Sequence, residues 1–337
     1  MLTLLTRLSP GNPLAAGEAD RVLGSALLGQ VPRQAEPAWP EQLIFAPFSG
    51  STATGGREIW QSAVPCTAGH AEGIAWRRAG DVLYGVIELD EAAFAGAGGG
   101  SPLQAASREA YARIFRLLAA QGLPHLWRAW NYFADINGES HGLERYRQFN
   151  IGRQDAFLDH ARTATGNLPA ACAIGLAGGP LNIAFMAGAQ PATAIENPRQ
   201  ISAYDYPADY GPRSPSFSRA ALVALPGQQI LFVSGTASIV GHRTVHAGDA
   251  TAQCREAMDN IAAVLAEANR QCQSAAYTLG ELSYRVYVRH AADFDGVKAV
   301  LIARLGAAAD IVFVQADICR ADLLLEIEAT ALHALAG

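Results

Sequence analysis

The order strand, helix, strand occurs twice along this chain, and the repeat limits the possible folds more than any other feature. In the first copy, residues 81–89 read as an apolar strand and residues 102–120 as a helix. Gly122 is placed to end that helix, because glycine adopts the left-handed conformation at little steric cost. The aromatic stretch 125–136 then reads as a second strand.

The second copy begins with a strand at residues 229–235 and a long helix that runs to about residue 271. Asp249 is the expected N-cap, since its side chain can accept a hydrogen bond from the free amides of the first turn. Ala257, Ile261 and Val264 recur at helical spacing. The remaining predicted elements are strands at 282–288, 310–316 and 323–330 and a helix at 294–305.

This pattern predicts an α+β protein of two units, each a mixed β-sheet with helices packed on one face. We expect an N-terminal unit at residues 1–145 and a C-terminal unit at residues 146–337, since 337 residues exceed the usual size of one domain. Between the two patterns, residues 146–225 are rich in Gly, Pro, Tyr and Arg. Long irregular segments in compact proteins are commonly functional, so this one is the predicted substrate-binding segment.

Composition narrows the classes of partner. A net charge of -6 disfavours nucleic acid, and the absence of an apolar run of about 20 residues disfavours a membrane span. The first residues lack a basic stretch followed by a long apolar core, so we expect no signal peptide. Five scattered cysteines without CxxC spacing indicate reduced thiols in a cytoplasmic protein, with no metal site. No motif implies a cofactor, and a monomer or small homo-oligomer is expected.

Four short motifs of the C-terminal half resemble the YjgF/Rid domains, which are chorismate-mutase-like in fold. They are Val233-Ser234-Gly235-Thr236, Gln253 with Asn260-Ile261, Tyr287-Val288, and Leu325-Glu326-Ile327-Glu328-Ala329. The resemblance implies that each unit has this fold. Rid-type imine deaminases carry a carboxylate-binding arginine about fifteen residues before the first glutamate of the last motif, where this chain has Ile311.

A longer set of ordered motifs resembles the chorismatase family. The motifs are Phe149-Asn150-Ile151-Gly152-Arg153, Ile195 to Gln200, Tyr210 to Arg219, Ser234 to His242, and Cys319-Arg320 ahead of Leu325-Glu326. The resemblance covers about residues 125–331. It implies an enzyme that binds the small molecule chorismate and releases pyruvate from its enolpyruvyl ether.

Glu326 is the expected general acid. Strand alternation puts Glu326 and Glu328 on one face, and burial would raise a carboxyl pKa as a proton donor near neutral pH requires. From the residues alone, a solvated carboxylate or an ion pair with Arg320 is the better explanation of Glu326. The family resemblance places the catalytic glutamate at Glu326, where it would protonate the enolpyruvyl methylene. Glu328 is then the expected ion-pair residue.

Arginines suit the two carboxylates of chorismate, because a guanidinium offers two parallel donors to one carboxylate. Arg153, Arg213 and Arg219 fall in segments expected to be irregular, where binding groups are common. Tyr210 lies within ten residues of two of them. Arg219 and Tyr210 are the strongest substrate-binding candidates, followed by Arg213, with Arg153 in support.

Cys319 and Ala237 bear on the product. A lone cysteine is usually a small buried hydrophobe. The resemblance instead associates a cysteine at Cys319 with the branch that makes 3-hydroxybenzoate, whereas a glycine at Ala237 would match that branch better. We therefore expect 3-hydroxybenzoate, alone or with 4-hydroxybenzoate, and keep hydrolysis to 3,4-dihydroxycyclohexa-1,5-diene carboxylate as the alternative. Two alternative functions remain: a Rid-like imine deaminase and a non-catalytic module that binds a small molecule.

Overall fold

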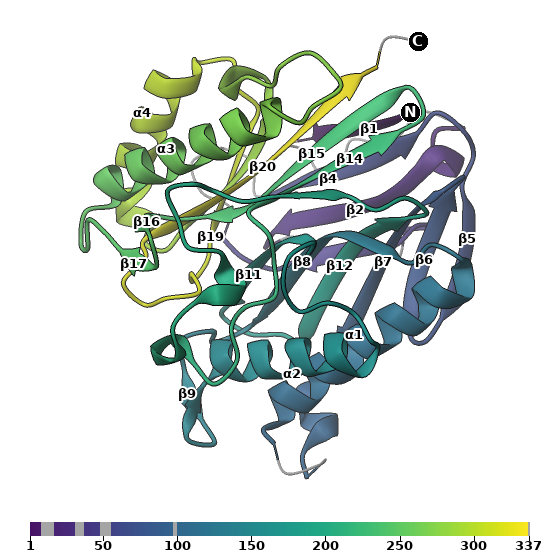
Figure 1. Cartoon of the computed structure of the whole chain (residues 1–337), viewed down its shortest axis with the longest axis horizontal. Coiled ribbons are helices and arrows are strands. Elements are labelled where there is room, and N and C mark those ends of the chain that lie inside the picture. Colours follow the sequence, from purple (N-terminus) through teal and green to yellow (C-terminus); the bar gives the residue numbers. More distant parts are fainter. Residues whose placement is uncertain (8–16, 31–36, 48–54, 97–99, 336–337) are drawn as a thin grey trace.

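The computed structural model describes residues 1–7, 17–30, 37–47, 55–96 and 100–335. Its first large sheet is built, in chain order, from β5 (Thr67–Ala71), β6 (Ile74–Ala79), β7 (Val82–Leu89), β8 (His125–Ala134), β11 (Ala170–Leu176) and β12 (Leu181–Gly188). Their order across the sheet is β11-β8-β12-β7-β6-β5. Helices α1 (Pro102–Gln121) and α2 (Arg145–Asp159) cover one face of this sheet (Figure 1).

The second large sheet is built from β13 (Thr193–Ile195), β14 (Ala220–Leu225), β15 (Gln228–Thr236), β18 (Ser283–Val288), β19 (Ile311–Gln315) and β20 (Leu325–Ala334). Their order is β13-β14-β15-β20-β18-β19. Helices α3 (Ala250–Asn269) and α4 (Phe294–Leu305) pack on its outer face. The α+β class is therefore confirmed, with two sheets that each carry helices on one face.

A four-stranded sheet that the sequence analysis did not anticipate lies between the two units. Its strands are β1 (Leu2–Arg7), β2 (Val22–Gly29), β3 (Glu41–Ile44) and β4 (Gly55–Ser62), in the order β1-β4-β2-β3. Trp60 of β4 packs against Phe232 of the second large sheet, and Tyr84 of the first belongs to the same apolar core. The helix-free faces of both large sheets thus share one core with this small sheet. Short hairpins β9–β10 (Glu139–Ser140, Leu143–Glu144) and β16–β17 (Ile239–Val240, Arg243–Thr244) complete the strands.

The two large sheets meet along β11 and β15. The Ala171 amide donates to Ser234 Oγ at 2.9 Å, and Ala170 forms a backbone bridge with Ser218. A second bridge joins Gly175, at the far end of β11, to Asp317. Segments far apart in the sequence therefore come together at this seam.

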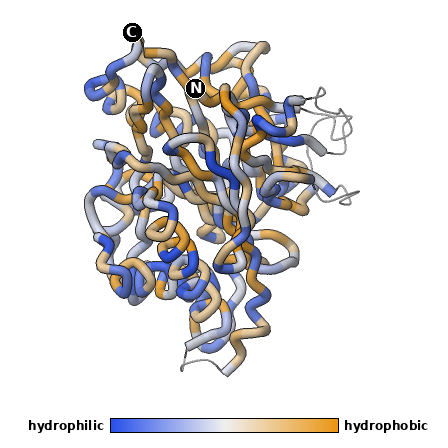
Figure 2. The backbone as a smooth tube through the Cα atoms, turned by 90° about the vertical axis from the view of Figure 1, so that its right-hand side faces the viewer, coloured by the Kyte–Doolittle hydropathy of each residue, from blue (hydrophilic) through white to orange (hydrophobic). Residues whose placement is uncertain are grey.

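The helix ends follow the expected local chemistry. Gly122 caps α1 with φ of 66°, and Asp249 accepts a hydrogen bond from the Ala252 amide at the start of α3. The predicted strands and helices of the two repeated patterns are all present, with boundaries shifted by at most a few residues. Hydrophobic residues form continuous stretches along the inner strands, whereas hydrophobic and hydrophilic residues alternate along the turns of the helices (Figure 2).

The prediction that residues 146–225 form an irregular segment is wrong. This stretch contains most of α2 and the strands β11, β12, β13 and β14. Because β11 and β12 pair with β8, the first large sheet extends to Gly188, well beyond the boundary expected between residues 145 and 146.

The sequence of α2 shows no helical spacing of apolar residues because polar residues occupy much of its buried face. The buried face of α2 carries Gln148, Asn150 and Arg153 as well as Phe149, so apolar residues do not recur at a spacing of three and four. Gly152 lets α2 approach α1, because a Cβ there would collide with the Gln104 carbonyl oxygen. Strands β11 and β12 are buried on both faces and rich in alanine, which removes the alternation typical of half-exposed strands.

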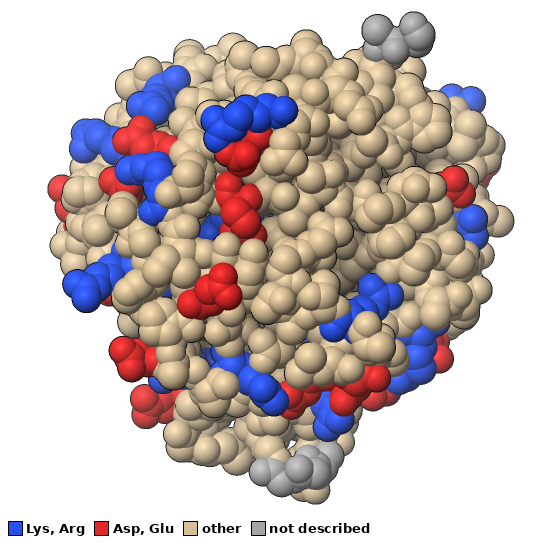
Figure 3. All heavy atoms as spheres, in the orientation of Figure 1, with Lys and Arg blue, Asp and Glu red and all other residues tan. Residues whose placement is uncertain are grey.

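On the face shown in Figure 3, positively and negatively charged side chains are intermixed. Among the helices of the described residues, none is long and apolar enough to cross a membrane. The five cysteines are all free thiols. Cytoplasmic localisation and the oligomeric state remain predictions.

Candidate active site

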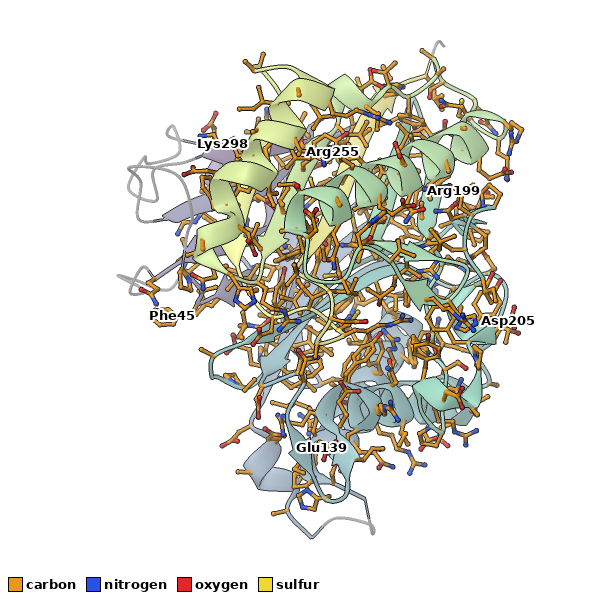
Figure 4. All side chains as sticks on the ribbon, turned by 90° about the vertical axis from the view of Figure 1, so that its left-hand side faces the viewer. Phe45, Glu139, Arg199, Asp205, Arg255 and Lys298 are labelled. Carbon is orange, nitrogen blue, oxygen red and sulfur yellow. The ribbon has the colours of Figure 1, made fainter. Side chains whose placement is uncertain are left out.

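A cavity of about 210 Å³ lies at the seam between the two large sheets. Helix α2 and strand β11 of the first unit form one side, and the ends of β15 and β20 form the other. The segment from η3 (Ala203–Asp205) through η4 (Ala208–Tyr210) to Arg219 covers it. Figure 4 shows Asp205 of η3 on the outer side of the molecule, between the layer of α3 and α4 and the layer of α2.

Glu326 of β20 lines this cavity with only 4% of its surface exposed. Its carboxyl group occupies the space that a side chain at residue 235 would fill, since a Cβ on Gly235 would collide with Glu326 Oε1. Burial raises the pKa of Glu326 to about 8, and the negative charge of Glu328 adds to the rise. Arg128 and Arg219 lower the pKa in part. Glu326 is therefore mainly protonated at neutral pH.

Glu328, two residues along the same strand, has a different environment. Its carboxylate forms ion pairs with Arg128 of β8 and, at 3.1 Å, with Arg285 of β18. Tyr287 donates a further hydrogen bond to Glu328 at 3.1 Å. Arg285 in turn pairs with Glu58 of the four-stranded sheet. Glu328 is thus held as a buried, fully paired anion, as its expected ion-pair role requires.

Cys319 lies on the loop before β20 and lines the cavity beside the Glu326 carboxyl group. Burial and the neighbouring Glu326 raise the pKa of Cys319 to about 12, so the thiol stays protonated. Cys172 of β11 lines the same wall, and burial raises its pKa well above the usual range. Both sulfur atoms therefore present neutral S–H groups to the cavity.

Arg153 reaches the cavity from α2 and is 2% exposed. One of its Nη atoms donates to Asn150 Oδ1 at 3.0 Å, and its guanidinium lies close to the Tyr111 hydroxyl. Tyr111 donates to Asn131 at 2.8 Å, which anchors the group to β8. Arg153 Nε is buried without a hydrogen-bond partner among the described residues.

Arg219 approaches from the start of β14 and is 5% exposed. It donates to the Ile201 carbonyl and to the Tyr206 hydroxyl, each at 2.8 Å. Its Nε is also buried and unpartnered in the described structure. Glu196 attracts Arg219 from outside ion-pair distance, and burial raises the pKa of Glu196. Two buried guanidinium groups with free donors are suited to hold anionic groups of a ligand.

Tyr210 helps to close the cavity. Its hydroxyl donates to the His242 carbonyl at 2.7 Å, and the Arg320 guanidinium lies 4.2 Å from the centre of its ring. Arg320 also donates to the His242 carbonyl at 2.9 Å. No ion pair joins Arg320 to Glu326 among the described residues, so the alternative of an Arg320–Glu326 pair is not what the structure contains.

The structure brings together most of the residues singled out from the sequence. Six of them line the cavity: Arg153, Tyr210, Arg219, Ala237, Cys319 and Glu326. Arg213 does not, because its side chain is exposed and lies 3.4 Å from Asp155 on the outer side of α2. Arg153 sits on a helix rather than in an irregular segment, which corrects that expectation.

Sequence reasoning missed other lining residues. Arg147 and Tyr146 come from the first turn of α2, and Cys172 from β11, two elements that gave no pattern. Phe217 lies two residues before Arg219, so its ring could have been suspected from that proximity. The ring of Tyr206, which the sequence left open as a packing residue, also lies against Arg219. With Glu326 neutral, the arginines outnumber the remaining lining carboxylate, Glu144, so the cavity favours a ligand with more than one negative charge. Across the described residues, no three His, Cys, Asp or Glu side chains are grouped as metal ligands.

Comparison with known proteins agrees with this geometry. The family described as Chorismatase FkbO/Hyg5-like, N-terminal, matches residues 58–187. A chorismatase from Streptomyces rapamycinicus is 40% identical over 278 residues, covering 80% of each chain. A 3-hydroxybenzoate synthase from Streptomyces hygroscopicus is 37% identical over 282 residues, again covering 80% of each. A crystal structure of a chorismatase superimposes with a TM-score of 0.86 and 34% identity, covering 98% of both chains.

Proposed function

The chain belongs to the chorismatase family, and from this premise we propose that Glu326 protonates the enolpyruvyl methylene of chorismate. The observation that carries the proposal is a buried carboxyl group with a pKa of about 8 on the wall of an arginine-lined cavity. Such a group holds its proton at neutral pH and can deliver it to carbon when the transition state develops. Glu328 supports this role because its fixed negative charge opposes ionisation of Glu326.

Arg153 and Arg219 hold the two carboxylates of chorismate in this proposal. Each is buried and has a free Nε donor, so a carboxylate replaces a missing partner and competes with no existing ion pair in the described structure. Tyr210 and the segment around it cover the bound substrate. Exclusion of bulk water protects the oxocarbenium ion that protonation creates.

The fate of that ion decides the product. Attack by water gives a hemiketal, whose collapse releases pyruvate and leaves the dihydroxycyclohexadiene carboxylate. Attack by the neighbouring ring hydroxyl takes no water into the products, and aromatisation then yields hydroxybenzoate together with pyruvate. In both routes Glu326 is regenerated, since the proton given to the methylene is balanced by one released later from water or from the ring.

We propose that the main ring product is 3-hydroxybenzoate. Cys319 supports this, because its thiol lines the cavity beside the Glu326 carboxyl group. A relative at 37% identity is named 3-hydroxybenzoate synthase, which agrees with that assignment. Ala237, a buried residue that also lines the cavity, favours a second outcome, either hydrolysis or some 4-hydroxybenzoate.

Incubation with chorismate, followed by chromatography of the ring products and enzymatic measurement of pyruvate, tests the proposal. We expect equal amounts of pyruvate and ring product, with 3-hydroxybenzoate dominant. Cys319→Ala should still release pyruvate but shift the ring product toward the dihydrodiol, because a methyl group leaves more room for water and offers no S–H donor. An unchanged product ratio in this variant would reduce Cys319 to a packing residue. Absence of pyruvate from wild-type enzyme would overturn the proposed function itself.

A further inference from the structure

Arg289 follows β18 and lies outside the cavity, yet it binds the loop that carries Cys319 and Arg320. This loop, residues 316–324, joins β19 to β20 and will be called the 316–324 loop. The Arg289 side chain is 10% exposed. Arg289 is not among the residues that line the cavity.

All three nitrogens of the Arg289 guanidinium are used. Nη2 donates to the carbonyl of Ile318 at 3.1 Å and to that of Arg320 at 2.9 Å. Nε donates to the carbonyl of Leu323 at 2.8 Å, and Nη1 pairs with Asp317 at 2.6 Å. The Ile318 and Arg320 carbonyl groups belong to the residues on either side of Cys319. Arg289 therefore holds the peptide group that precedes Cys319 and the one that follows Arg320.

Arg289 also links the loop to the first unit. Nη2 lies 3.2 Å from Asn137 Oδ1, in the turn after β8. Asp317 exchanges two backbone hydrogen bonds with Gly175 at the end of β11, at 2.8 and 3.0 Å. Since the cavity is formed between the two units, a tie at this point sets the distance between the wall with Cys319 and the wall with Cys172.

We propose that Arg289 is a positioning residue that holds Cys319 and Arg320 in register with Glu326 and thereby controls both the rate and the ring product. The inference rests on the proposed roles of Cys319 and Glu326. A planar guanidinium can serve acceptors at both ends of the loop at once, whereas a lysine ammonium is a single point donor that cannot span them. A misplacement of about 1 Å at a reacting group can cost on the order of a hundredfold in rate.

The test compares three variants. Arg289→Lys keeps the positive charge but removes the planar guanidinium group, whose several N–H donors reach different carbonyl groups. Asp317→Asn removes only the ion pair and leaves the carbonyl contacts of Arg289 intact. Arg57→Lys changes a partly buried arginine of the four-stranded sheet, paired with Glu41 at 2.7 Å, and controls for the general effect of the substitution.

One readout does not depend on turnover: the rate at which iodoacetamide alkylates Cys319 in the native protein, followed by peptide mass spectrometry. We expect Arg289→Lys to raise this rate about fivefold or more, because the thiol is no longer held in place beside Glu326 and becomes more exposed. Asp317→Asn and Arg57→Lys should stay near the wild-type rate. The second readout is kinetic: kcat for pyruvate release should fall about tenfold in Arg289→Lys, with the ring product shifted in the same direction as in Cys319→Ala.

If Arg289→Lys leaves Cys319 alkylation and product ratio unchanged, or changes them no more than Arg57→Lys does, the positioning role is wrong. Wild-type enzyme that releases pyruvate in the same assay shows that such a failure concerns Arg289 alone. Wild-type enzyme that releases none would count against the proposed function, while the alkylation rates would still decide whether Arg289 orders the loop.

Discussion

Strands β12 and β20 occupy the same place in two sheets of the same topology, yet only β20 carries acids. Both large sheets run through three antiparallel strands, a helix, a strand, a second helix and two further strands, and each has a parallel pair at one edge. On the helix-free face, β12 presents Asn182 and Ala184, where β20 presents Glu326 and Glu328. The architecture is repeated, whereas the chemistry is present in one copy.

The surroundings of that face explain the difference. In the first unit the four-stranded sheet closes over β12, and Gln42 of β3 donates to Asn182 at 2.9 Å. In the second unit Glu328 is neutralised by arginines, while Glu326 opens onto the cavity. A repeated fold therefore supplies two similar faces, and the candidate site forms on the one whose strand β20 borders the cavity at the seam.

The largest expected effect comes from Glu326→Gln, which removes from β20 the carboxyl group that faces the cavity. Loss of the transferable proton should lower kcat by about 10²–10⁴-fold while chorismate binding persists. The measurements are steady-state kinetics and calorimetric titration with chorismate. A near-normal kcat in this variant would show that another group is the proton donor.

The same variant has an opposite effect on stability. The pKa of Glu326 is raised to about 8 in the folded protein, so folding takes up a proton between pH 4.5 and 8, and the stability of the wild type falls as pH rises through that window. Glutamine removes this dependence. We expect Glu326→Gln to melt at a higher temperature than wild type at pH 7.5 and at a similar temperature at pH 4, as scanning calorimetry can show.

Arg219→Ala tests whether the cations of the seam bind substrate. Removal of a charge-assisted contact from a buried site costs on the order of 2–5 kcal/mol, so KM should rise by about thirtyfold or more. Arg219→Lys should restore only part of the affinity because lysine lacks the planar fork. Arg213→Ala is the matched control, since Arg213 is exposed and lies outside the cavity. If Arg219→Ala and Arg213→Ala bind chorismate with equal affinity, Arg219 does not bind a carboxylate of the substrate.

Gly235→Ala and Gly85→Ala compare the two sheets directly, because β7 and β15 hold equivalent places. A Cβ at Gly235 meets the Glu326 carboxyl group, whereas one at Gly85 meets the ring of Phe185 in the helix-side core. We expect Gly235→Ala to lower kcat about tenfold or more and Gly85→Ala to lower Tm with kcat per folded molecule retained. The same response from both variants would mean that the two faces are not functionally distinct.

The smallest effect is a shift along the pH axis. Glu328→Gln removes the anion that helps to raise the pKa of Glu326 and leaves Arg128 uncompensated, so the pKa of Glu326 should fall. The active form is the protonated acid, so the alkaline limb of kcat/KM should move to lower pH by about one unit. Glu41→Gln, at another buried ion-paired carboxylate, should leave the limb in place. If the alkaline limb of kcat/KM stays at the same pH in Glu328→Gln, Glu328 does not influence the pKa of the proton donor.

Local patterns were enough to predict much of the second unit. The period of α3, the Asp249 cap and the alternation of β20 are properties of neighbouring residues, and the structure contains all three. The motifs around Glu326, Cys319, Arg219 and Tyr210 likewise identified residues that the structure brings to one cavity. Their catalytic and binding roles remain proposals.

What the sequence by itself determined was therefore the α+β class and the repeated order of elements, and it singled out Glu326 as the candidate acid. Only the tertiary structure decided which side chains share the cavity, that α2 is a helix, and that Arg213 points away. The physical reason is that α2, β11 and the four-stranded sheet are specified by burial against distant partners and carry polar or alanine-rich buried faces. The spacing of apolar residues indicates only which side of a helix or strand is buried. Contacts between distant segments, such as those of Arg289 with the 316–324 loop, cannot be predicted from that spacing and are seen only in the folded structure.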